Sequence, residues 1–235
     1  MGERAEAYRA ELRRLKAWEP YLKKHSGLPG PRANLELVAA VAEEADADRL
    51  WHLSTSEDEF LALCGVAGLG KVALIEPDAV LKRLHEMAPD PRWRVREGVA
   101  MALQRIGRED MPGLLALMAR WADEEEPFVR RAVVAGLCEP AILGRNEDAV
   151  GVLEILDRIT RAVVASNDRR GDGHVALRKA LGYGWSVAAS AAPENAIPYI
   201  QKWMGSQDRD VVWIMKSNLA KSRMAPLLPK LRESG

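Results

Sequence analysis

The sequence of 235 residues has few of the residues that build disulfide frameworks, metal sites or membrane spans. It contains two cysteines and four histidines, and no window approaches the ~18 uninterrupted apolar residues that a membrane-spanning helix needs. Its first residues, MGERAEAYRAELRRLK, lack the apolar core of a secretory signal peptide. These absences argue against membrane proteins and secreted disulfide scaffolds, so we expect a cytoplasmic protein.

The few cysteines and histidines are not spaced as metal ligands or catalytic groups. Cys64 and Cys138 stand in apolar stretches, where a cysteine acts as a small core residue. No two histidines are four residues apart, and none lies near a cysteine, so the zinc-binding patterns are missing. We therefore predict no metal and no cofactor.

The sequence also lacks a net charge, because 34 lysines and arginines balance 34 aspartates and glutamates. This balance argues against a uniformly basic protein that coats nucleic acid. The charges are unevenly distributed, however. Residues 149–235 contain 13 basic and 8 acidic residues, a net charge of +5, so residues 1–148 carry −5. This asymmetry predicts a basic surface in the C-terminal part of the chain.

What the sequence does contain is a repeated helical pattern. Large apolar residues that anchor a helix recur at intervals of 34, 34, 48 and 34 residues: Leu69, Leu103, Leu137, Trp185 and Leu219. Such a period is typical of a helical solenoid, in which each helix pair buries its apolar face against its neighbours. We therefore predict an all-α protein, a right-handed α-solenoid of about five helix pairs that forms a single domain over residues 1–235.

Proline, glycine and acidic residues divide this domain into a cap, five helix pairs and a tail. Residues 1–32 are predicted to form an N-terminal capping helix (3–25) and a turn, residues 33–222 the five pairs, and residues 223–235 a short tail. The pairs are expected at 33–54 with 57–70, 77–88 with 92–106, 111–122 with 127–138, 147–165 with 174–190, and 194–204 with 209–220. We assign the longer interval of 48 residues to a longer first helix in the fourth pair and to the polar loop 166–173.

The second helices of the pairs open alike, with an acidic residue followed by valine and arginine, as in DPRWRVR (90–96) and EPFVRR (126–131). The acid accepts hydrogen bonds from free N–H groups and complements the helix dipole. These openings resemble those of HEAT repeats. The resemblance implies that Arg96, Arg130 and Arg178 pair with neighbouring acids and tie the repeats together, with direct contact to a ligand as the less common alternative.

The 34-residue step aligns one position of each second helix in a column. In helix 92–106, steps of ~100° per residue place Trp93 and Glu97 opposite the buried stripe. The column then reads Leu63, Glu97, Arg131, Lys179 and Trp213, with Arg209, Lys216 and Lys221 on the last helix and just beyond it. We expect this column to line the concave face of the solenoid, and an exposed tryptophan there needs a neighbour or a ligand to cover it.

A groove that combines cations with aromatic rings suits nucleic acid, because cations neutralise phosphates and rings pack against sugars or bases. Phosphate repels a carboxylate such as Glu97. The carboxylate fits such a groove if it stabilises a cation, for example the oxocarbenium-like sugar that forms when a glycosidic bond breaks.

At these residues the chain resembles the AlkD-like alkylpurine DNA glycosylases, which are built from HEAT-like helix pairs. Trp93 and Glu97 are similar to a tryptophan and an aspartate four residues later in that family, and RKALGY (178–183) places Tyr183 at a second family tryptophan. The resemblance implies removal of alkylated purines from double-stranded DNA, with Glu97, Trp93 and Tyr183 as catalytic residues. The residues it assigns to DNA binding, together with the basic column, are Arg130, Arg131, Arg178, Lys179, Trp185, Arg209, Trp213, Lys216 and Lys221.

Over its whole length the chain more closely resembles HEAT-repeat proteins of bacteria that share the stretches WRVRE (93–97), CEP (138–140) and LGYGWS (181–186). This resemblance leaves a second hypothesis open, in which the chain is a non-catalytic scaffold that binds a protein or peptide in the same groove. Trp93 and Trp213 would then be the anchors, because tryptophan and arginine dominate interface energetics. Under both hypotheses we expect a monomer with no membrane partner.

Overall fold

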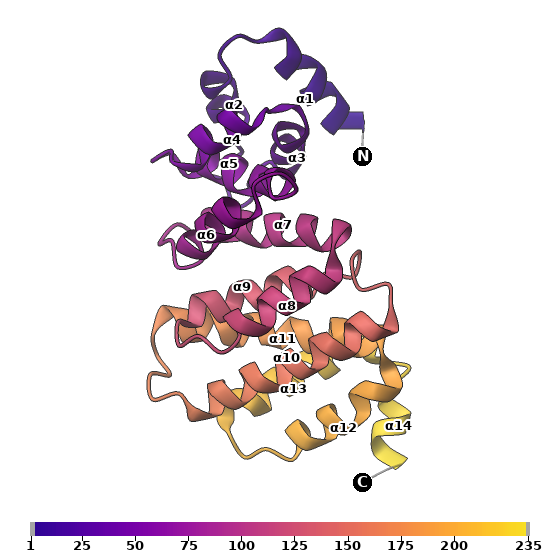
Figure 1. Ribbon diagram of the computed structural model, residues 1–235. Helices are drawn as coiled ribbons and strands as arrows, with labels where there is room; N and C mark the ends of the chain where they lie inside the picture. Colours follow the sequence, from indigo (N-terminus) through magenta and orange to yellow (C-terminus); the bar gives the residue numbers. More distant parts are fainter. Residues whose placement is uncertain (1–2, 234–235) are drawn as a thin grey trace. The chain divides into compact units, whose positions relative to one another are not determined.

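The computed structural model of the protein describes residues 3–233 (Figure 1). Within this range the chain forms α-helices and one short 3₁₀ helix, and it forms no β-strand. The chain divides into two compact units, Met1–Ile106 and Gly107–Gly235. The predicted all-α class and the arrangement as an α-solenoid of helix pairs are confirmed.

The first unit is built around the buried helix α5. Its helices are α1 (Glu3–Arg14), α2 (Glu19–His25), α3 (Leu35–Glu44), α4 (Ala47–Ser54), α5 (Glu59–Val72), α6 (Pro77–Met87) and α7 (Trp93–Glu109), whose last residues belong to the second unit. Helices α2, α3, α4 and α6 all pack on α5, and no residue of α5 is classed as exposed. This unit therefore encloses its central helix.

Two small residues let other helices approach α5 closely. A Cβ atom on Gly65 would lie 2.1 Å from the backbone nitrogen of Ser54 in α4, and one on Gly70 would lie 2.6 Å from the carbonyl oxygen of Ala102 in α7. Both neighbours are backbone atoms, which cannot move aside as a flexible side chain can. Glycine at these positions is therefore required by packing.

Two of the predicted helices are each divided in the structure. The capping helix predicted over 3–25 is split into α1 and α2, and the helix predicted over 33–54 is split into α3 and α4. Pro20 stands in the first turn of α2, where a backbone N–H has no acceptor within the helix. The proline therefore loses no hydrogen bond at this position, and a new helix starts there. Asp46 caps α4 by accepting a hydrogen bond from the Arg49 N–H at 2.8 Å.

The second unit follows the predicted pairs closely. Its helices are α8 (Met111–Trp121), α9 (Pro127–Leu137), α10 (Asn146–Ala165), α11 (Asp172–Ala191), α12 (Pro193–Met204), α13 (Arg209–Leu219), the 3₁₀ helix η1 (Ser222–Met224) and α14 (Leu228–Glu233). Helix α11 packs against both α9 and α13, so the second helices of successive pairs are neighbours. The predicted tail contains α14, which packs on α12.

The anchors of the repeat lie in the core, as the period predicts. Leu69, Leu103, Leu137 and Trp185 are fully buried, and Leu219, the last anchor, is half-buried near the end of α13. The two cysteines are free and buried, and burial raises the pKa of each thiol. Both cysteines therefore act as core residues.

Candidate functional site

The exposed residues of α11 and α13 are mostly cationic or aromatic. They are Asp172, Lys179, Tyr183 and Ser190 on α11 and Arg209, Trp213 and Lys216 on α13. We call Lys179, Tyr183, Arg209, Trp213 and Lys216 the basic–aromatic face. On each helix these residues are three or four positions apart, so they lie on the same side of that helix. Lys221, also exposed, follows α13 directly.

The indole ring of Trp213 is seated on α11. A Cβ atom on Gly182 would lie 2.7 Å from the ring atom Cζ3, so the missing side chain lets the ring approach the helix. The guanidinium carbon of Arg178 lies 4.9 Å from the ring centroid, which is a cation–π contact. Trp213 is thus held in place by α11 and still has 40% of its surface exposed.

Tyr183, the next residue after this glycine, has a similar support. The guanidinium carbon of Arg223 lies 4.7 Å from the tyrosine ring centroid, and its Nη2 donates a hydrogen bond to the tyrosine hydroxyl at 3.1 Å. Tyr183 is 38% exposed. Each exposed ring of the basic–aromatic face is therefore accompanied by an arginine.

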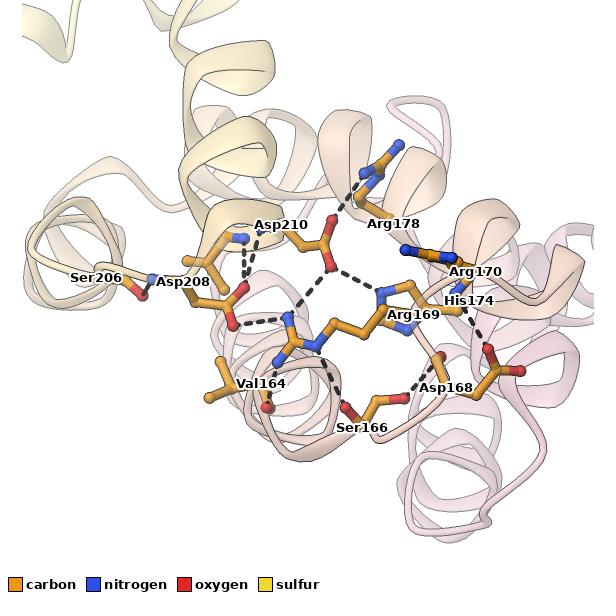
Figure 2. Close-up of polar contacts among 11 residues, drawn as sticks. Val164, Ser166, Asp168, Arg169, Arg170, His174, Arg178, Ser206, Asp208 and Asp210 are labelled. Carbon is orange, nitrogen blue, oxygen red and sulfur yellow. Dashed lines mark hydrogen bonds and ion pairs between the residues drawn. The ribbon is translucent and has the colours of Figure 1, made fainter.

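A buried carboxylate holds Arg178 in position. Figure 2 shows Asp210 between Arg169, His174 and Arg178. It accepts a hydrogen bond from Arg178 Nη1 at 2.7 Å and forms an ion pair with Arg169 at 3.2 Å, and the His174 Nε2 atom lies 3.0 Å away. Burial alone would raise the pKa of the Asp210 carboxyl, but hydrogen bonds from Arg178, His174 and Arg169 outweigh it and hold the pKa below its usual value. We call these four residues the Asp210 cluster.

The Asp210 cluster also anchors the polar loop 166–173. Arg169 of this loop forms a second ion pair with Asp208 at 2.7 Å and donates to the Val164 carbonyl at 2.6 Å, both drawn in Figure 2. Asp168 accepts hydrogen bonds from the backbone N–H groups of Arg170 and Gly171. The loop 166–173, which contributes to the longer interval of 48 residues, is thus bound to the start of α13.

The pairing with an acid that is expected for the HEAT-like arginines is observed at Arg178, whereas Arg96 and Arg130 bind backbone carbonyls. Arg178 pairs with Asp210 of the next helix pair, as the resemblance implies. Arg96 donates to the Pro91 carbonyl at 3.0 Å, and Arg130 donates to the Ala122 carbonyl at 3.2 Å, so these two bind backbone oxygens before their own helices. All three arginines therefore tie structural elements together.

Some members of the predicted column are buried. Leu63 has no exposed surface because it lies within α5, and Arg131 is only 8% exposed on α9. Trp185, which the resemblance placed at DNA, is also fully buried and donates its indole N–H to Thr160 at 3.1 Å. These positions correct the expectation of an open column, and its exposed members in the second unit are Lys179 and Trp213.

Trp93 and Glu97 belong to the first unit, whereas Tyr183 belongs to the second. The predicted exposure of Trp93 is confirmed at 48%, and Trp93 lines a pocket of about 540 Å³ together with Ser26, Pro29, Asp58 and Glu59. Glu97 accepts a hydrogen bond from Arg94 Nη1 at 2.9 Å, so its charge is compensated by a neighbour one turn away.

Two partners of the basic–aromatic face were missed by the sequence analysis. Gly182 is part of the LGYGWS stretch, but nothing in the period shows that a ring from the next pair rests on it. Arg223 stands in the predicted tail, outside every repeat. The acid before each second helix was the signal that could have revealed Asp210, since it stands two residues after Asp208, which caps α13.

Comparison with known proteins concerns the scaffold. The family model of HEAT repeats matches residues 47–138. This segment begins at the first residue of α4 and ends immediately after α9. Residues 47–138 are therefore similar to HEAT repeats, and α10–α13 continue the same arrangement of helix pairs.

Two solved structures that match the chain carry titles that describe them as engineered proteins. One is 16% identical with a TM-score of 0.45, over 93% of this chain and 98% of the other. The second is 16% identical with a TM-score of 0.35, over 90% of this chain and 57% of the other. No curated protein matches the chain.

Two further properties bear on the site. Among the described residues, no group of three or more histidine, cysteine, aspartate or glutamate side chains is arranged to hold a metal ion. In the same part of the chain, no helix combines the length and the apolar character needed to cross a membrane.

Proposed function

We propose that the protein is a HEAT-like scaffold that binds double-stranded DNA through the basic–aromatic face of its second unit. The observation that carries this proposal is that Asp172 is the one acidic residue among the exposed positions of α11 and α13, whose other exposed residues are mostly cationic or aromatic. DNA presents a regular array of phosphates, and a surface of lysine and arginine side chains binds it by releasing counterions. Phosphate contacts of this kind position the duplex without reading its sequence.

The availability of the cations supports this proposal. Lys179, Arg209, Lys216 and Lys221 are exposed, and none of them forms an ion pair with an acid in residues 4–231. Because no neighbouring carboxylate offsets the positive charges of these four side chains, the charges are available to bind a ligand. Arg178 and Arg169, in contrast, are engaged by Asp210 and are expected to contribute through structure.

The test is the salt dependence of binding to a fluorescently labelled duplex, measured by anisotropy. If the four free cations contact phosphates, the affinity should fall about 100-fold between 50 and 200 mM salt. Replacement of Lys179, Arg209, Lys216 and Lys221 by glutamine should abolish binding at 50 mM salt. Absence of duplex binding by the unaltered protein at 50 mM salt would overturn the proposal.

A second candidate function, binding of a protein or peptide, is favoured by the exposed tryptophans. Trp93 and Trp213 are 48% and 40% exposed, and large rings of this kind act as anchors at interfaces. An interface centred on such anchors weakens little over the same range of salt. Salt-insensitive binding of a peptide, lost when Trp213 is replaced by alanine, would favour this candidate over DNA.

The glycosylase activity implied by the resemblance is tested separately. The observation that favours it is the exposed ring of Trp93 beside a pocket, with Glu97 one turn along α7. We infer that the Glu97 carboxylate would have to leave Arg94 to stabilise a cationic sugar, because it is already paired. The unaltered protein should release the alkylated base from alkylated duplex DNA faster than the Glu97→Ala variant does. Equal rates of release would exclude the activity.

A further inference from the structure

Among the tryptophans of the second unit, Trp213 differs from the others in its exposure. Trp121, Trp185 and Trp203 of this unit are buried, whereas Trp213 exposes 40% of its surface. Exposure of a large apolar ring to water is unfavourable, and such a ring indicates a position that a ligand or partner covers. The setting of this ring therefore indicates what would cover it.

The indole ring of Trp213 is supported by contacts with α11. Gly182 supports one part of the indole, and Arg178 packs on the ring at 4.9 Å from its centroid. Arg178 is itself fixed by its 2.7 Å hydrogen bond to the buried Asp210. Binding to such a ring loses little side-chain entropy, since the side chain is already ordered.

Charged groups around the ring define the chemistry of the ligand. Lys216 stands one turn after Trp213 on α13, and Lys179 stands one turn before Tyr183 on α11. Both lysines are exposed. A nucleotide has the matching features, because its base stacks on an aromatic ring and its phosphates attract the lysines. A neutral apolar side chain of a peptide would use the ring but leave the cations without partners.

We propose that Trp213 is a stacking site for one unpaired base, so that the protein prefers DNA duplexes containing an unpaired nucleotide over fully paired ones. In a paired duplex each base face is already covered by its neighbours, and removing a base from the stack costs free energy that a bulged or gapped nucleotide does not require. The proposal rests on the proposed function, since Lys179, Lys216 and the other free cations hold the phosphates on either side.

The experiment compares two labelled duplexes of the same sequence, one fully paired and one with a single-nucleotide bulge, at 100 mM salt. The unaltered protein should bind the bulged duplex about tenfold more tightly, near the lower limit of the contribution from stacking one base. The Trp213→Leu variant should bind the two duplexes equally, and Trp213→Phe, which keeps a smaller ring, should retain an intermediate preference. The control is Met204→Ala, an exposed residue at the end of α12 that lies outside the face and should keep the full preference.

The variants separate this inference from the proposed function. Lys216→Gln should weaken binding to both duplexes by the same factor and leave their ratio unchanged. Equal affinity of the unaltered protein for the two duplexes, with salt-sensitive binding to both, would overturn the stacking site and leave DNA binding intact. No binding to either duplex would overturn both. Circular dichroism on each variant shows that a lost preference does not come from unfolding, and a preserved preference in folded Trp213→Leu would also overturn the stacking site.

Discussion

The second helices of the helix pairs follow the same repeat pattern in both units, but their charged side chains differ in exposure and in partners. In the first unit α5 is enclosed on all sides, and the cations of α7 up to residue 106 are engaged: Arg94 pairs with Glu97, Arg105 pairs with Glu43, and Arg96 binds backbone carbonyls. In the second unit α11 and α13 expose Lys179, Arg209 and Lys216 without acidic partners among the described residues. A repeated sequence position thus determines the direction of a side chain, whereas neighbouring elements determine whether it reaches solvent.

The largest expected effect is in the enclosed helix of the first unit. We expect Gly65→Ala to lower the free energy of unfolding by about 3 kcal/mol, because its Cβ would overlap the Ser54 backbone at 2.1 Å. Urea denaturation followed by circular dichroism measures this change. The matched control is Gly144→Ala in the second unit, where a Cβ would meet nothing within 4 Å and stability should change by less than about 0.5 kcal/mol. A Gly65 variant as stable as the unaltered protein would refute the enclosed packing of α5.

The next largest effect concerns the Asp210 cluster of the second unit. Asp210→Asn should lower the free energy of unfolding by about 2 kcal/mol at neutral pH, because Arg169 and Arg178 lose a buried partner. The control is Asp172→Asn, an exposed residue of α11, which should change stability by less than about 0.5 kcal/mol.

The same cluster predicts a dependence on pH. The folded-state pKa of Asp210 lies below its unfolded value of about 3.9. Its contribution is therefore fully present above that value and is lost as the pH falls through the lower, folded-state pKa. Urea titrations at pH 7 and at pH 3 should show a smaller loss of stability on acidification for Asp210→Asn than for the unaltered protein. An equal loss would show that this carboxylate does not carry the effect.

A smaller effect is expected at Gly182, which sharpens the contrast with Gly65. In Gly182→Ala the new Cβ meets the movable indole ring of Trp213 at 2.7 Å, and alanine is favoured over glycine in a helix by about 1 kcal/mol. These effects oppose each other, so stability should stay within about 1 kcal/mol of the unaltered protein. The displaced ring should nevertheless reduce the preference for a bulged duplex, measured by anisotropy, and a full preference in this variant would contradict the seat of Trp213 on α11.

The smallest effects are expected for single cations of the basic–aromatic face. Lys179→Gln and Lys216→Gln should each reduce the slope of log affinity against log salt by about 1. Both residues are exposed, so stability should change by less than about 0.5 kcal/mol. Lys82→Gln on α6 of the first unit is the matched control, because this lysine is exposed on a first helix and should leave the slope unchanged. Equal slopes for all three variants would remove the distinction between the two units.

The period and the capping residues predicted most of the fold. Proline at the start of α6, α9 and α12 and the caps Glu126 and Asp208 placed most helices of the repeats within a few residues. The breaks between α1 and α2 and between α3 and α4 were missed, although Pro20 and Asp46 mark them, because the apolar spacing runs on across both breaks.

The candidate site was predicted less completely, for a physical reason. Trp185 was both an anchor of the period and a DNA contact by resemblance, and its complete burial agrees with the period. The period gives the orientation of a side chain around its own helix but contains no information on what covers it. Arg131, which shares its repeat position with exposed Lys179, is buried for this reason, and the support of Trp213 by Gly182 depends on a contact between different pairs.

The anchored loop 166–173 has a consequence for how the chain opens. In a repeat array each helix pair is stabilised by the pairs that it contacts. Here Asp210 of α13 binds Arg169, His174 and Arg178, and Asn218 of α13 binds the backbone of α11 at Leu181 and Ser186. The fourth and fifth pairs therefore share their polar contacts and should exchange their amide hydrogens as a single cooperative unit.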